Sequence, residues 1–168
     1  QWLVGSCRML ECELPPPLVS TSLLRGLGQD LFAPPNVKGW DGGMAWITTN
    51  NLLARYNQAA LLAEGDMSIA ASLATGPTKK PDRVKQIQRR MRNMRAGGVD
   101  VEKILIEQER ADKEQLISAL EKRLLQGNLS QKQELAVRDY LNGQTTLDDS
   151  NIRDAIRLVM CTPEYQVT

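Results

Sequence analysis

Apolar residues recur at every third or fourth position through much of the chain, and this spacing constrains the fold more than any other feature. It is the spacing of one face of an α-helix, because about 3.6 residues complete a helical turn. No strand or hairpin pattern competes with it. The two clearest stripes are Leu116, Ile117, Leu120 and Leu124, and Ile152, Ile156, Val159 and Met160.

Residues that begin and end helices separate the stripes. Short polar side chains can accept hydrogen bonds from the first free amides of a helix, whereas glycine and proline end one. The expected N-terminal caps are Ser20 or Thr21, Thr48 or Thr49, Asp82, Asp100, Asp112, Ser130, and Asp148 or Asp149. The expected stops are Pro15, Gly28, Gly65, Gly97, Gly127, Gly143 and Pro163.

Some inward faces can also be predicted. A helix over residues 2–14 would bury Leu3, Cys7, Leu10 and Leu14, and the helix before Gly143 would bury Leu135 and Leu141. A short helix is expected over residues 68–74, and a helix after Asp82. The helix that ends at Gly65 is expected to bury Leu52, Leu53, Tyr56, Ala60 and Ala63.

We therefore predict an all-α fold, an irregular multi-helix bundle with an ordered loop rich in proline, glycine and tryptophan. Aromatic residues make up only 4% of the chain, and the abundance of Leu and Ala favours helices over sheets. We expect residues 1–168 to form a single helical domain. The chain opens inside an apolar run without a methionine, so the alternative is the C-terminal fragment of a larger domain. Residues 75–98 would be a basic linker and helix inserted in it.

The composition argues against several kinds of site. The chain has no histidine, so its residues cannot supply a catalytic Ser-His-Asp triad or an imidazole metal ligand. We expect no metal and no cofactor, and no segment approaches the length of a transmembrane helix. Cys7 or Cys12 can pair with Cys161 in an oxidising compartment, but buried free thiols are the simpler interpretation.

A cluster of positive charge lies between Lys79 and Arg95. This segment has a formal charge of +7 and the whole chain has +1, so the remainder carries −6. Its basic face could follow nucleic acid phosphates or anionic lipid, but no aromatic residue is interleaved for stacking or anchoring. We expect a solvated basic face, and no nucleic acid partner. Its residues are Arg83, Lys85, Arg89, Arg90, Arg92 and Arg95.

The stretch from Phe32 to Asn57 is the candidate binding loop. Its aromatic residues and one carboxylate could form a platform for a sugar or a peptide. We favour a structural clasp, in which Trp40 and Trp46 supply buried apolar area and the glycines adopt positive φ. Arg55 and Asn57 would then bond to loop carbonyls. The candidate residues are Phe32, Pro34, Pro35, Gly39, Trp40, Asp41, Gly42, Gly43, Trp46, Arg55 and Asn57.

Paired carboxylates offer a third candidate chemistry. Asp148 and Asp149, and Glu107 and Glu109, stand where helix caps and solvated faces usually occur. We interpret them as caps and assign no catalytic residue. The chain itself is then not expected to be an enzyme.

Two motifs resemble a known family. The first runs from Gly28-Gln29-Asp30-Leu31-Phe32 through Pro34-Pro35-Asn36-Val37-Lys38-Gly39-Trp40 to Leu52-Leu53-Ala54-Arg55, and the second is Thr162-Pro163-Glu164-Tyr165-Gln166. Both are similar to motifs of the bacterial family called domain of unknown function 1800, in the same order. The motifs place the resemblance at both ends of the chain, with no counterpart for residues 66–100.

The resemblance implies a helical protein of the bacterial cell envelope or an exported one. Because members of that family are longer, it also implies that this chain is their C-terminal portion. It suggests two partners, a protein of the family called domain of unknown function 1501 and the upstream part of its own chain. It carries over no reaction, so the expected role is a scaffold or a partner-binding module. The alternative is part of an enzyme whose active site lies mostly upstream, with the Trp40 loop as one wall.

Overall fold

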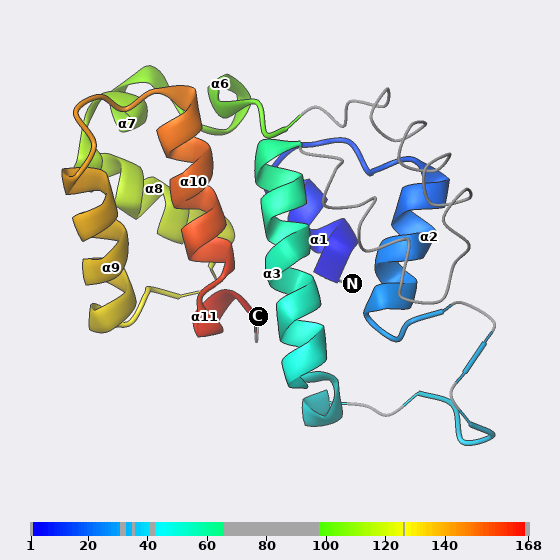
Figure 1. Cartoon of the computed structure of the whole chain (residues 1–168). Helices are drawn as coiled ribbons and strands as arrows, with labels where there is room; N and C mark the ends of the chain where they lie inside the picture. Colours follow the sequence, from blue (N-terminus) through cyan, green and yellow to red (C-terminus); the bar gives the residue numbers. More distant parts are fainter. Residues whose placement is uncertain are drawn as a thin grey trace. The chain divides into compact units, whose positions relative to one another are not determined.

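A computed structural model describes residues 2–30, 33–34, 36–40, 43–65, 98–125 and 127–166, apart from the side chains of Leu18, Met44 and Trp46. Every regular element of these ranges is a helix, which confirms the all-α class (Figure 1). The predicted helices over 68–74 and after Asp82, and most of the 75–98 insert, lie outside the described residues. None of the helices described is long and apolar enough to cross a membrane.

The chain divides into two compact units. Unit 1 comprises residues 1–13, 62–64 and 97–168, and unit 2 comprises residues 14–61 and 65–96. The prediction of one helical domain over 1–168 stays a prediction.

Unit 1 contains most of the helices. They are α1 (Trp2–Met9), α6 (Val101–Ile104), α7 (Glu107–Ala111), α8 (Lys113–Leu124), α9 (Gln131–Asn142), α10 (Asp149–Met160) and α11 (Pro163–Gln166). Helices α8, α9 and α10 pack against one another, and α7 packs on α8 (Figure 1). Their inward side chains are fully buried, as the two stripes predicted: Leu116, Leu120, Leu124, Ile152, Ile156 and Met160.

Caps explain where these helices begin. The carboxylates of Asp100, Asp112 and Asp148 accept hydrogen bonds from the backbone amides of Glu102, Gln115 and Asn151 at 3.2, 3.2 and 2.8 Å. Each bond satisfies an amide that has no partner inside its helix. All three predicted caps are confirmed, as is the predicted break after Ala111.

Helix α1 ends earlier than the apolar pattern predicted. It stops at Met9 because Glu11 takes a left-handed conformation with φ of 48°. Leu14, which was expected on its buried face, is 52% exposed, so that prediction was wrong. Arg123 of α8 holds this end, since its Nε donates to the Met9 carbonyl at 2.8 Å and its guanidinium pairs with Glu11.

Unit 2 contains α2 (Pro17–Gly26), the 3-10 helix η1 (Gly43–Trp46) and most of α3 (Thr49–Glu64). The expected cap of α2 at Ser20 or Thr21 was wrong. The helix begins at Pro17, whose fixed φ suits a first turn, and the Ser20 and Thr21 hydroxyls bond back to the carbonyls of Pro15 and Pro17.

Helix α3 has the predicted ends and part of the predicted face, since Ala60 and Ala63 are buried as expected. Thr48 caps its first turn and Gly65, with φ of 71°, ends it. Leu53 is 59% exposed, whereas Gln58 is fully buried and donates from its amide to the Leu23 carbonyl of α2 at 3.1 Å. Because this hydrogen bond satisfies its amide, the polar Gln58 can be buried. A pattern of apolar residues alone places it on the exposed side.

The last turn of α3 belongs to unit 1, where the chain returns to it after residue 97. The Val99 amide donates to the Ala63 carbonyl at 3.1 Å. Two arginines of α10 reinforce this junction, since Arg153 donates to the Val99 carbonyl at 2.9 Å and Arg157 pairs with Glu64 at 2.8 Å. The chain therefore leaves and re-enters unit 1 at one place.

Candidate functional site

The candidate binding loop is described in part. Pro34, Gly39, Trp40 and Gly43 lie within the described residues. Four other candidates of the loop lie outside the described residues: Phe32, Pro35, Asp41 and Gly42. Of Trp46, only the backbone is described. The basic face also lies entirely outside it, over Arg83, Lys85, Arg89, Arg90, Arg92 and Arg95.

A tight turn shapes the middle of the loop. Asn36 accepts hydrogen bonds from the Lys38 amide at its side chain, at 2.8 Å, and from the Gly39 amide at its carbonyl, at 3.0 Å. Gly39 has φ of 88° and Gly43 has φ of 59°. The predicted positive φ is therefore confirmed at these two glycines, where a side chain would be strained.

Trp40 is less buried than the clasp interpretation expected. Its side chain is 39% exposed, and the neighbouring Val37 is fully exposed. This exposure corrects the expected burial, while the choice between a clasp and a ligand wall stays a prediction.

Arg55 and Asn57 lie on α3 and are both half-buried. Burial lowers the pKa of the Arg55 guanidinium, because desolvation disfavours its charge. Their predicted hydrogen bonds to loop carbonyls stay a prediction.

The acidic pairs include helix caps. Asp148 caps α10, and the Glu109 carboxylate accepts from the Ile106 amide at 3.0 Å at the start of α7. Asp149 lies in the first turn of α10 and is 3.6 Å from Arg153. Across the residues that the structure describes, no three acidic, cysteine or histidine side chains gather as a metal site would require.

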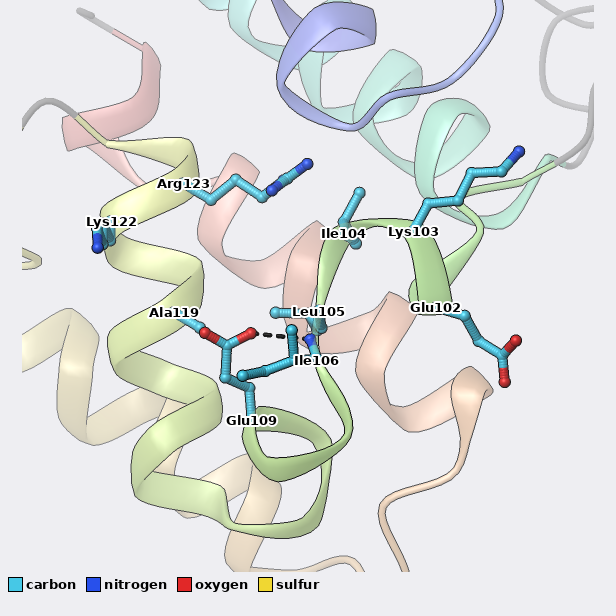
Figure 2. A pocket seen from close by; sticks show the side chains of 9 residues that line it. All are labelled: Glu102, Lys103, Ile104, Leu105, Ile106, Glu109, Ala119, Lys122 and Arg123. Atoms are coloured by element: carbon cyan, nitrogen blue, oxygen red, sulfur yellow. Dashed lines mark hydrogen bonds between the residues drawn. The ribbon is translucent and has the colours of Figure 1, made fainter.

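A cavity of about 440 Å³ lies in unit 1, between the α6–α7 segment and α8, and no motif pointed to it (Figure 2). Figure 2 shows Leu105 and Ile106 near its centre, with Lys122 and Arg123 on α8 and Lys103 on α6 around it. One feature of the sequence could have indicated this cavity. The run Ile104-Leu105-Ile106 places three large aliphatic residues in a row, and a short segment cannot bury all three.

The apolar part of the cavity follows from that run. Ile104 and Leu105 are buried, at 6% and 2% exposed, whereas Ile106 is 60% exposed. Ile106 precedes the first turn of α7, where its amide is fixed by Glu109. An aliphatic side chain therefore stands open to solvent on a backbone that is held in place.

The charged residues of the cavity differ in whether another residue of the chain pairs with them. Glu102 is 3.4 Å from Arg110, Lys103 is 3.5 Å from Asp100, and Arg123 is held by Glu11 and the Met9 carbonyl. Within the described part of the chain, Lys122 has no ion-pair partner. The cavity thus combines an exposed isoleucine with one uncommitted ammonium group and a guanidinium nearby.

Comparisons with known proteins identify the family of this chain but no reaction, ligand or partner. A family model described as "Protein of unknown function (DUF1800)" matches residues 1–167. The match includes residues 66–100, for which the sequence motifs had no counterpart. Searches among curated proteins and among solved structures returned no match.

Proposed function

From the premise that this chain belongs to the DUF1800 family of proteins of unknown function, we propose that it is a helical partner-binding module. The observation that carries the proposal is the cavity of unit 1, whose lining includes the exposed Ile106 and the cationic Lys122 and Arg123 of α8. Its occupant would be an acidic protein segment with an aliphatic side chain.

The apolar contact would supply most of the affinity. Ile106 is more than half exposed, beside two buried aliphatic neighbours, so a partner's leucine or isoleucine can bury area against it. A few well-packed apolar side chains usually dominate binding energy at an interface. The backbone at Ile106 is already ordered by Glu109, so binding there requires little further ordering.

Charge would set the orientation of the partner. The Lys122 ammonium and the Arg123 guanidinium lie on consecutive residues of α8 beside the cavity (Figure 2). Lys122 has no ion-pair partner among the described residues and is available to a carboxylate. An acidic segment would gain charge-assisted hydrogen bonds there, and would associate faster at low salt.

The family resemblance supports the cellular setting of the proposal. We infer an exported bacterial protein whose C-terminal portion is this chain. The partner would be a protein of the family called domain of unknown function 1501, or the upstream part of its own chain. The all-α architecture suits a scaffold, since packed helices hold exposed side chains at fixed positions.

The test measures binding of the purified chain to a purified protein of the domain of unknown function 1501 family encoded beside it. Titration calorimetry should show a complex that Ile106→Ser weakens at least about tenfold, as loss of a central apolar contact does. Leu135→Ser is the matched control, because Leu135 is 50% exposed on α9 and outside the cavity lining. Equal weakening by both variants would contradict the proposal, as would the absence of a complex both with this protein and with the purified upstream part of the chain's own protein.

A second candidate follows from the exposure of Trp40. The chain would be part of an enzyme whose active site lies mostly upstream, with Trp40 stacking on a sugar ring or a peptide group. Oligosaccharides of the chitin and maltose series, added to the full-length protein, should then change its tryptophan fluorescence. Trp40→Phe should remove that change without a large fall in melting temperature. An unchanged response in the variant would exclude Trp40 as the binding wall.

A further inference from the structure

The C-terminal end of α1 brings two cysteines together. The Cys12 amide donates to the Cys7 carbonyl at 3.0 Å, and the Glu11 amide donates to the Arg8 carbonyl at 3.3 Å. With Glu11 in the left-handed conformation, these two bonds form a Schellman motif. In that motif, the side chains at the positions of Cys7 and Cys12 usually contact each other.

The thiols behave as a pair. A hydrogen bond between them raises the pKa of Cys7 and lowers the pKa of Cys12, and burial adds to the rise at Cys7. Cys7 is buried, whereas Cys12 is half-buried and reachable from solvent. The two side chains therefore differ in the way that an attacking and a resolving cysteine differ.

The surroundings hold this geometry in place. Arg123 fixes the Met9 carbonyl and the Glu11 carboxylate on one side. Tyr165 is 4% exposed, and its own pKa is raised by burial and also by the negative charge that either thiolate would carry. A bond between the two sulfur atoms would thus close a short loop whose backbone is already folded.

We propose that Cys7 and Cys12 are a redox modification site, which forms a reversible disulfide across the end of α1 by exchange with a small-molecule disulfide. The Cys12 thiolate attacks one sulfur of that disulfide and releases the first small thiolate. The Cys7 thiol then loses its proton and attacks the Cys12 sulfur, which releases the second. Two protein thiols are oxidised, one small disulfide is reduced to two thiols, and the two protons end on those thiols.

This pairing differs from the one that the sequence suggested. A bond from Cys7 or Cys12 to Cys161 was the alternative there to free thiols, and all three cysteines are free in the structure. Burial raises the pKa of the Cys161 thiol, and Arg157 partly opposes that rise. It would stay a free thiol after oxidation.

The test treats the full 168-residue chain with oxidised glutathione and maps its thiols by mass spectrometry. Trypsin cuts after Arg8, so the disulfide should join peptide 1–8 to peptide 9–25, and reduction should separate them. The intact protein should lose two hydrogen atoms, and only Cys161 should then react with iodoacetamide. A peptide that links Cys161 to either cysteine, a lasting glutathione adduct on Cys12, or three unchanged thiols would overturn the proposal.

Two variants test which cysteines form the disulfide. Cys161→Ser should form the same disulfide, whereas Cys12→Ser should abolish the loss of two hydrogens. Helical circular dichroism of each variant, with and without oxidant, shows whether the chain is folded. Oxidation of wild type that proceeds only after denaturation would also contradict a site built by the folded cap.

Discussion

The side-chain oxygens of Ser6 and Tyr165 lie 2.7 Å apart, although 159 residues separate them in the chain. Ser6 is on α1 and Tyr165 is on α11, and they are 2% and 4% exposed. Trp2 packs edge-on against the Tyr165 ring, with centroids 6.5 Å apart. One hydrogen bond and one ring contact therefore join the first and last helices of unit 1.

Tyr165→Phe should destabilise the chain by about 1–3 kcal/mol, because it leaves the buried Ser6 hydroxyl without its partner. Urea unfolding followed by circular dichroism measures the change. Tyr140→Phe is the matched control. Its hydroxyl donates to Asp154 at 2.9 Å in a part-buried setting, where water can replace it. We expect a smaller loss of stability there. Equal losses would show that the buried Ser6–Tyr165 bond stabilises the fold no more than a part-buried one.

Glu11→Gly should be more stable than Glu11→Ala by about 1 kcal/mol. Both variants lose the ion pair with Arg123, but only glycine removes the strain of a left-handed conformation at φ of 48°. The comparison is made by urea unfolding of the two variants. If alanine proved as stable as glycine, the Schellman motif at the end of α1 would be in doubt.

Gly98→Ala should cost about 1–3 kcal/mol, as overpacking against a fixed neighbour does. A Cβ at this position would lie 2.8 Å from the Glu64 carbonyl carbon and oxygen, which are backbone atoms of α3. Gly127→Ala should have little effect, since nothing lies within 4 Å of a Cβ there. Thermal unfolding of both variants distinguishes them, and a neutral Gly98→Ala would contradict the close approach.

Alkaline pH should weaken the fold through Tyr140. Burial, together with Asp154, raises the pKa of Tyr140 from 10.0 to about 12. As pH rises, the unfolded chain therefore loses the Tyr140 proton at a lower pH than the folded chain does. The stabilisation is therefore complete below pH 10 and is lost as pH rises from 10 to 12. The free energy of unfolding, measured across this range, should fall less steeply in Tyr140→Phe. Identical slopes would exclude Tyr140 as a source of the pH dependence.

Much of the fold could be predicted because its signals are local. Asp100, Asp112 and Asp148 cap helices through amides two or three residues away, so a short window of sequence contains both partners. The stripes of α8 and α10 were also predicted, since each of these helices has a single continuous apolar face.

The errors in the predicted buried faces arose where distant residues decide. Leu53 and Leu135 fit an apolar pattern yet are 59% and 50% exposed. On α3 the buried side includes Gln58, which depends on a carbonyl 35 residues away. A polar residue is buried only if such a partner exists, and the sequence does not say whether it does.

The candidate site was harder to predict than the fold. The sequence drew attention to the aromatic loop, but the exposure of Trp40 depends on which residues pack against it, and a local pattern does not contain them. The cavity beside Ile106 combines α6, the start of α7 and the C-terminal half of α8, so it depends on how three helices pack and no single apolar stripe indicates it. Cys7 and Cys12 were noted as thiols, but their pairing follows from one left-handed residue between them.

The hydrogen bond between Ala63 and Val99 has a consequence for tolerance to insertion. Unit 1 itself holds Ala63 and Val99 together, so a flexible chain inserted between them would begin and end at one place. Each doubling of a flexible loop adds only about 0.6 kcal/mol. A flexible linker or a foreign domain inserted between Gly65 and Gly98 should therefore leave the packing of helices α6 to α11 unchanged.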